Sequence, residues 1–531
     1  MAPAKKDSKS ARHPPKKTKA AKPAPEPSTF DEFLDEALSL EDKGDRYVSG
    51  IKAQRFYTRA TEMYAQAHRL VSTDMHVLYN WGRILLLLTE FTDPILAPEE
   101  RRRLLKEAID KLRQGGQDGN VECLFNLSQA LRGLAEVALE DGVGDVREGV
   151  QGLVEADSVF DKVYRVQFAE WEKSREDERD GQKGKGKETV DCSEGKVCTV
   201  HCHGEEENEA VEQDKGEPHE DRPGEDEYEM VTTMDSTTLS TLLDTLTAHI
   251  QTLTLLFKEL PDPETTAYYE KSLSKLTHGQ TLLSKYASTI DIKDVSAYTA
   301  EFGIRGAEIF AARADTVLEQ YRRLETSCYE EALKKLDGVL STDKKNVEAL
   351  CCKGDVLVSW ADAIKTVNGG LENMLSLSLS ATCSTSGSSS PTPASDALTQ
   401  MRTLYSAAST AYTEAYTTTP TNANIAKTLG DTHLTRIPLY STKDQITLAL
   451  NAEKYYRRTI TLCDDDQVIG PVLLRLAIVL SWADKEQECR KVLLAWKKKG
   501  CPGVGEEDSG VPFNDTVKGA EWFETLVGGL V

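Results

Sequence analysis

The stretch that decides the fold is ASTAYTEAYTTTPTNANIAKTLG, residues 408–430. Its key positions are Ala408-x3-Tyr412-x2-Ala415-x4-Pro420, followed by Leu429-Gly430. Alanine and tyrosine at spacings of three and four fall on one face of a helix, whereas the proline ends that helix. The pattern therefore predicts two consecutive helices that approach each other closely where their residues are small.

The same spacing recurs in two other parts of the chain. The three pairs that lie 22 residues apart are Ala60 with Gly82, Ala332 with Gly354, and Ala408 with Gly430. Around the first of them, Tyr64 and Ala67 repeat the aromatic and small positions. Ordinary amphipathic helices also place alanines and aromatics at such intervals, but three occurrences of one spacing favour an internal repeat of paired helices. The predicted fold class is all-α.

These residues resemble the tetratricopeptide repeat (TPR) superfamily, whose units of about 34 residues are antiparallel helix pairs. The resemblance implies a TPR-like α-solenoid with irregular inserts, and it covers about 300 of the 531 residues. Trp81-Gly82-x-Ile84-Leu85-Leu86-x-Leu88-Thr89-Glu90-Phe91 is also similar to plant-type mitochondrial import receptors of the TPR class. Membership of that family would imply a C-terminal membrane anchor.

Composition divides the chain into segments of different character. Lys5 to Lys22 holds eight basic residues and one acid, whereas 204–229 holds thirteen acids and two bases; neither can form a core. Thr29 can cap a helix that begins at Phe30, and the leucines within the Thr-rich run 231–254 keep helical spacing. We expect a disordered basic tail (1–29), a helical block (30–172), a disordered acidic insertion (173–230), a second helical block (231–368), a Ser/Thr-rich linker (369–396), a C-terminal helical block (397–498) and a tail with one short helix (499–531).

The net charge and the cysteine spacing indicate which partners and which cellular compartment to expect. A net charge of -23 disfavours nucleic-acid binding and favours a basic protein partner. The eleven cysteines form no regular framework, which indicates a reducing compartment. Lys5-Lys6 and Lys16-Lys17-Thr18-Lys19 resemble a bipartite nuclear localisation signal, although a solvated tail has the same composition. No apolar run approaches the length of about 20 residues that a membrane span needs. We expect a protein of the nucleus, the cytoplasm or both, without a membrane span.

Stacked helix pairs create a groove that can hold a peptide. One TPR class binds chaperone tails through a clamp of Lys, Asn and Arg, and Asn80, Arg83 and Asn126 resemble part of it. Phosphate-loop, dinucleotide and hydrolase motifs are lacking, so we expect neither a catalytic residue nor a cofactor. Cysteines and histidines between Cys192 and His203 could bind zinc, but their spacing matches no common finger. The sequence favours a non-catalytic scaffold or chaperone adaptor with a peptide or basic protein client; the alternatives are an organelle import receptor and a metal-dependent enzyme.

Overall fold

The computed structural model describes residues 27–47, 50–91, 96–139, 144–185, 237–383, 393–463 and 466–498. Within these ranges the regular elements are α-helices and two short 3₁₀ turns, without a strand, as the predicted all-α class requires. Most of the basic tail, most of the acidic insertion with its Cys/His cluster, and the C-terminal tail from residue 499 lie outside the described residues. The chain divides into two compact units, residues 1–126 and 127–531.

The first unit contains two helix pairs and the beginning of a fifth helix. The elements are α1 (Phe30–Tyr47), α2 (Gly50–Leu70), α3 (Met75–Thr89), α4 (Pro98–Gly115) and the first turns of α5 (Val121–Leu139). α1 packs on α2, and α3 packs on α4. The predicted cap of the first helix is confirmed, because the Glu32 amide donates to Thr29 Oγ1 at 3.3 Å and the Thr29 amide donates to the Glu32 carboxylate at 3.1 Å.

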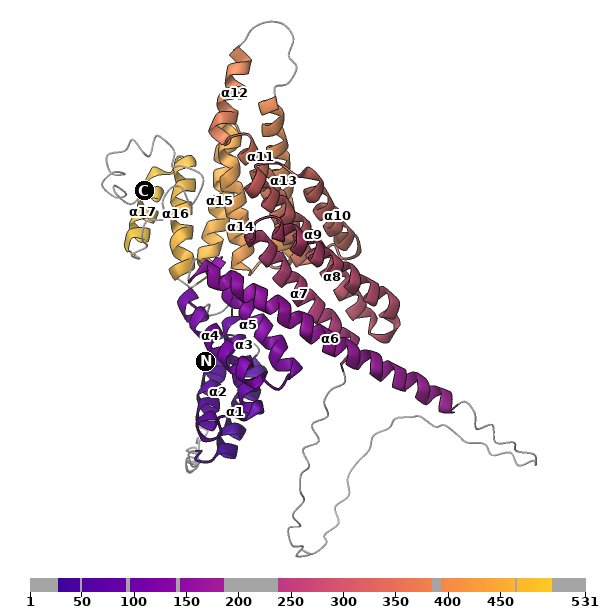
Figure 1. Ribbon diagram of the computed structural model, residues 1–531. Helices are drawn as coiled ribbons and strands as arrows, with labels where there is room; N and C mark the ends of the chain where they lie inside the picture. Colours follow the sequence, from indigo (N-terminus) through magenta and orange to yellow (C-terminus); the bar gives the residue numbers. More distant parts are fainter. Residues whose placement is uncertain are drawn as a thin grey trace, which may run out of the picture. The chain divides into compact units, whose positions relative to one another are not determined.

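The second unit continues the pairing of neighbouring helices (Figure 1). Its pairs are α7 with α8, α9 with α10, α11 with α13, α14 with α15, and α16 with α17. The remainder of α5 packs against α6, where a Cβ on Gly149 would lie 3.2 Å from that of Ala138. The bounds are α6 (Val146–Lys185), α7 (Leu239–Glu259), α8 (Glu264–Tyr286), α9 (Ile292–Tyr321), α10 (Thr326–Thr342), α11 (Val347–Val367), α12 (Leu371–Cys383), α13 (Pro393–Thr418), α14 (Ala423–Arg436), α15 (Thr442–Leu462), α16 (Asp466–Trp482) and α17 (Glu486–Lys498), with 3₁₀ turns η1 (Ala287–Thr289) and η2 (Ile437–Leu439).

Two predicted segment boundaries differ from the helices that form. α6 runs to Lys185, beyond the expected helix end at residue 172. Lys, Arg and Glu have good helix propensity, and the Arg175 guanidinium packs 4.8 Å from the ring centre of Trp171. Within the expected linker 369–396, α12 forms because Met374 is buried against the core beneath a Ser- and Leu-rich sequence. Composition alone therefore did not reveal that helices extend into both segments.

Glycines of the first helix in a pair lie against large side chains of the second helix. A Cβ on Gly354 of α11 would lie 2.5 Å from Tyr412 Cε1 of α13, which is inside any permitted contact. A Cβ on Gly430 of α14 would likewise lie 2.6 Å from Cε1 of Tyr456 on α15. The absence of a side chain at these glycines lets the tyrosine ring fill the space between the two helices.

Candidate protein-binding groove

A groove of about 470 Å³ opens in the second unit. Its walls come from α5, α7, α9 and α11, and each of these is the first helix of its pair. α8, α10 and α13, which are second helices, contribute no lining residue. The repeat therefore brings equivalent faces of four helices together around one concave space, although those helices are far apart in sequence.

Arg305 of α9 forms three ion pairs at the groove. Its Nε lies 2.7 Å from Glu301 Oε1, its Nη1 lies 2.7 Å from Glu308 Oε1, and its Nη2 lies 2.8 Å from Glu348 Oε1. Burial disfavours the charge of this guanidinium, but the surrounding carboxylates outweigh that effect and raise the pKa of Arg305. Burial also raises the pKa of Glu308, even beside the arginine. Arg305 is thus neutralised within the protein and offers little net charge to a ligand.

Asp315 of α9 and Asp355 of α11 border the same groove but have a different environment. The Tyr329 hydroxyl and the Ser359 hydroxyl donate to Asp315 Oδ1 at 2.7 and 2.5 Å. The Tyr412 hydroxyl donates to Asp355 Oδ1 at 2.5 Å. Among the described residues, no lysine, arginine or histidine nitrogen lies within 4.0 Å of either carboxylate. The two carboxylates are therefore held in place by hydroxyl groups, without a cation to balance them.

The pKa of Asp355 reflects its concave surroundings. The side chain is open to solvent at the groove, yet neighbouring protein displaces enough water to raise its pKa, against the opposing effect of the Tyr412 hydrogen bond. Asp362, two turns further along α11, accepts from the Tyr405 hydroxyl at 2.6 Å, and burial raises its pKa as well. Nearby Asp315 adds to this shift of Asp362 by repulsion. The α9 and α11 side of the groove is accordingly electronegative and short of positive charge.

The α5 and α7 side carries the remaining cations of the groove. The Arg132 guanidinium lies 3.3 Å from Glu136 Oε1 and also donates to Gln251 Oε1. Lys258 is exposed near the end of α7, and no carboxylate of the described residues lies within 4.0 Å of its ammonium group. The groove therefore has a mixed charge pattern, with basic groups on one wall and uncompensated carboxylates on the other.

A Gly-Asp pair that receives a tyrosine recurs in three helix pairs. Its members are Gly44-Asp45 with Tyr57, Gly354-Asp355 with Tyr412, and Gly430-Asp431 with Tyr456. In each case the tyrosine ring packs on the glycine, and its hydroxyl donates to the following aspartate at 2.5 to 2.7 Å. We call this arrangement the Gly-Asp/Tyr module. It fixes the distance between the two helices and holds one carboxylate in a defined orientation.

The three residues that resemble a clamp lie in the first unit. Asn80 and Arg83 are in α3, and Asn126 is in α5. Arg83 is bound by the Glu41 carboxylate, which also accepts from the Tyr64 hydroxyl. The Asn126 side chain lies close enough to Tyr79 to oppose the rise in the Tyr79 pKa that burial causes. Arg83 is thus engaged by an acid of its own unit, and a ligand carboxylate would have to compete with Glu41 for it.

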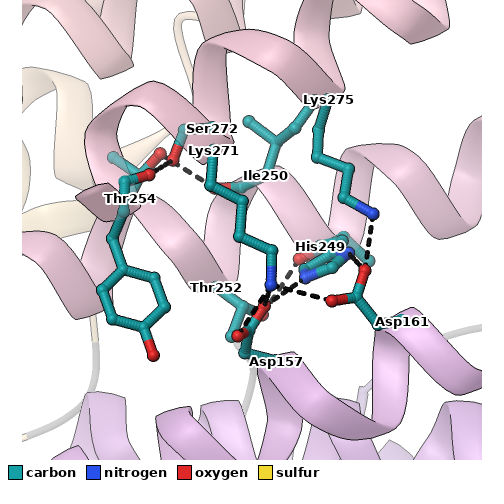
Figure 2. Close-up of polar contacts among 11 residues, drawn as sticks. Asp157, Asp161, His249, Ile250, Thr252, Thr254, Lys271, Ser272 and Lys275 are labelled. Atoms are coloured by element: carbon teal, nitrogen blue, oxygen red, sulfur yellow. Dashed lines mark hydrogen bonds and ion pairs between the residues drawn. The ribbon is translucent and has the colours of Figure 1, made fainter.

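A second polar cluster connects α6, α7 and α8 in the second unit (Figure 2). His249 is fully buried, and its Nε2 lies 2.7 Å from Asp157 Oδ1. Lys271 lies within 2.9 Å of Asp157 and Asp161, and Lys275 lies 2.6 Å from Asp161. Burial opposes ionisation of Asp161, but the hydrogen bonds and positive charge of both lysines lower its pKa to about 2.

This cluster has the residue types of a metal site, since the two aspartates and the histidine each offer one atom within 4.8 Å of the others. However, the ammonium group of Lys271 already contacts both carboxylates, where a cation would bind. A metal ion would therefore have to displace a charge-balanced lysine. We interpret the cluster as an ion-pair network that fastens three helices together.

Sequence reasoning identified the helices of the groove but neither polar cluster. Asp157 and Asp161, and likewise Lys271 and Lys275, are four residues apart and therefore share a helix face. The recurring Gly-Asp dipeptide was also visible in the sequence. Neither signal shows which helices meet, so the charge pairing and the groove required the three-dimensional structure.

Within each unit, the neighbouring helix pairs form an all-α, TPR-like repeat fold. In the described part of the chain, no helix combines the length and the apolar character needed to cross a membrane. No protein-family model matches the sequence, and no curated protein matches it.

Solved structures that resemble this chain include three helical proteins. A circular tandem repeat protein with novel repeat topology shares 14% identity, covers 94% of each chain and has a TM-score of 0.25. The nuclear import adaptor Nro1 of S. pombe shares 11% identity over 82% of this chain and 95% of its own, with a TM-score of 0.22. Yeast Tom70 shares 12% identity over 87% and 85%, with a TM-score of 0.16. Similarity at this level assigns no function to the chain.

Proposed function

We propose that this protein is a non-catalytic scaffold or chaperone adaptor that holds a segment of a partner protein in the groove of the second unit. The observation that carries the proposal is the groove of about 470 Å³ bordered by four first helices. A groove between rigid helices can bury the anchor side chains of an extended or helical segment, while its charges select the partner.

The charge of the groove and of the whole chain favours a basic partner. Asp315 and Asp355 at the groove lack a cation within 4.0 Å among the described residues, and the chain carries a net charge of -23. A ligand with lysine or arginine side chains would balance these carboxylates, and its approach would be accelerated by the long-range field. We further propose that the acidic stretch 204–229 adds to this attraction as a second, less specific contact.

Two matched variants test whether the groove is the binding surface. Thr254→Trp adds a large side chain at the groove, whereas Thr277→Trp makes the same change at an exposed position of α8, outside the groove. Each change removes one hydrogen bond from the threonine hydroxyl to a carbonyl of its own helix. Full-length chains would be used as bait in cells, and recovered proteins would be quantified. We expect Thr254→Trp to lose at least one partner that Thr277→Trp retains; identical recovery would refute the groove as the site.

A deletion tests the contribution of the acidic stretch. We expect removal of 204–229 to weaken binding of the recovered partner and to reduce the salt dependence of its affinity, because exposed charges act through a screened field. Unchanged affinity at low and high salt would show that the stretch takes no part in binding. The groove would then account for the interaction alone.

A further inference from the structure

Two copies of the Gly-Asp/Tyr module differ in how their aspartate is neutralised. Beside Tyr456, Asp431 Oδ1 lies 3.5 Å from the Nε of Arg475, which α16 contributes from the next helix pair. Asp431 Oδ2 also lies 3.6 Å from the Lys427 ammonium. Beside Tyr412, Asp355 has the same glycine and the same hydroxyl donor but no cation within 4.0 Å among the described residues. The charge of Asp431 is thus balanced by an arginine of the protein itself, whereas the charge of Asp355 is not.

The Asp355 module faces the groove, whereas the Gly44-Asp45 module, which also has no cation within 4.0 Å among the described residues, does not border it. Asp355 borders the cavity together with Asp315 of the neighbouring first helix. Hydroxyl donors occupy Oδ1 of each carboxylate, and no hydrogen bond to either Oδ2 is found in the described part of the chain. Both carboxylates line the same cavity of about 470 Å³. The Oδ2 atoms of Asp315 and Asp355 are therefore available as hydrogen-bond acceptors for a cation of the partner.

We propose that the groove binds an arginine side chain of its partner, and that Asp315 and Asp355 hold this side chain as Asp431 holds Arg475. This inference rests on the proposed function of the groove and adds the chemistry of its anchor. A guanidinium has five donors in a planar fork and is less strongly hydrated than an ammonium, so it can serve carboxylates on two helices at once. Arginine is thus favoured over lysine, and its neutral isostere citrulline should bind poorly.

The surroundings of Asp355 allow its role in binding to be distinguished from a role in stability. Surrounding protein raises the pKa of Asp355, so its charge is unfavourable in the free protein. Asp355→Asn keeps an oxygen to accept from Tyr412 and removes that charge. The variant should therefore unfold at an equal or higher urea concentration while it loses arginine selectivity. Binding sites commonly show this opposition between stability and function.

The test uses the purified full chain and a positional library of peptides of about ten residues, synthesised with arginine, lysine or citrulline at each position. We expect wild-type protein to retain arginine peptides about tenfold over their citrulline counterparts, with lysine between them. In Asp315→Asn/Asp355→Asn the ratio should fall to near one. Glu330→Gln/Glu331→Gln on α10 makes the same change in net charge away from the groove and should leave the ratio unchanged.

Three results would overturn the inference: no preference for arginine in the wild type, an equal preference in the double Asn variant, or lost preference with a lower unfolding midpoint. Thr254→Trp separates this failure from failure of the proposed function. If peptides bind and Thr254→Trp abolishes the binding, but arginine is not preferred, the groove function stands and the arginine anchor is wrong. If Thr254→Trp has no effect on peptide binding, both are wrong.

Discussion

Replacing Gly354 with alanine should destabilise the second unit, although glycine-to-alanine changes inside helices usually increase stability. The new Cβ would lie 2.5 Å from Cε1 of Tyr412, whose ring is buried and cannot move without disturbing both helices. Overpacking of this kind costs about 1–3 kcal/mol. Alanine recovers about 0.5–1 kcal/mol through its better helix propensity. We therefore expect a net loss of up to about 2.5 kcal/mol, centred on about 1 kcal/mol, in the free energy of unfolding.

Gly338→Ala is the matched control, because Gly338 lies inside α10 and a Cβ there would meet no atom within 4 Å. It should stabilise the protein by about 0.5–1 kcal/mol, since only the propensity term acts. Urea unfolding followed by circular dichroism at constant protein concentration would measure both variants. Tyr412→Leu introduced into Gly354→Ala should recover part of the loss, as expected for residues in contact. Equal stability of the two alanine variants would refute the close-approach account of the helix pairs.

Further predictions concern the ion pairs and the buried thiols. Because the pKa of Asp161 is lowered to about 2, its stabilising contribution of about 1–2 kcal/mol should be present above pH 4 and lost as the pH falls toward 2; Asp161→Asn should flatten acid unfolding in that window, and an unchanged profile would contradict the network. Arg305→Met should cost about 2–3 kcal/mol, less than a fully buried pair because its glutamates are partly exposed. That deficit should shrink as the pH falls from 7, since the raised pKa of Glu308 lets it take up a proton early; a deficit that grows toward acid would oppose this. Cys123 and Cys489 are fully buried with pKa raised to about 11 and about 12, so mass spectrometry should find both unmodified after brief iodoacetamide treatment at neutral pH, and rapid labelling of either would contradict its burial.

Helix pairing could be predicted from the sequence because it depends on local chemistry. Alanine, glycine and aromatic residues at helical spacing reveal which faces must be buried, and Pro420 reveals where a helix ends. Asn422 illustrates the same point, since its side chain caps α14 at the amides of Asn424 and Ile425. These signals lie within a few residues of the feature that they determine.

The partners of those faces could not be predicted, because they depend on which helices meet. Gly354 packs on Tyr412, and α12 lies between their helices in the chain. The carboxylates at the groove come from different first helices, and only the fold brings Asp315 and Asp355 to one cavity. Charge-rich composition was also misleading for α6, which continues to Lys185 although charged residues dominate its last turns.

The most direct measurement of the central claim is site-specific photocrosslinking of the full chain in cells. p-Benzoylphenylalanine would replace Thr254 at the groove or Thr277 on α8, and the crosslinked peptides would be sequenced by mass spectrometry. A groove that holds a basic segment predicts crosslinks from position 254 to an arginine-containing stretch of one partner, with none of that stretch from position 277. An arginine-containing stretch of a partner that crosslinks from position 277 but not from position 254 would contradict this account.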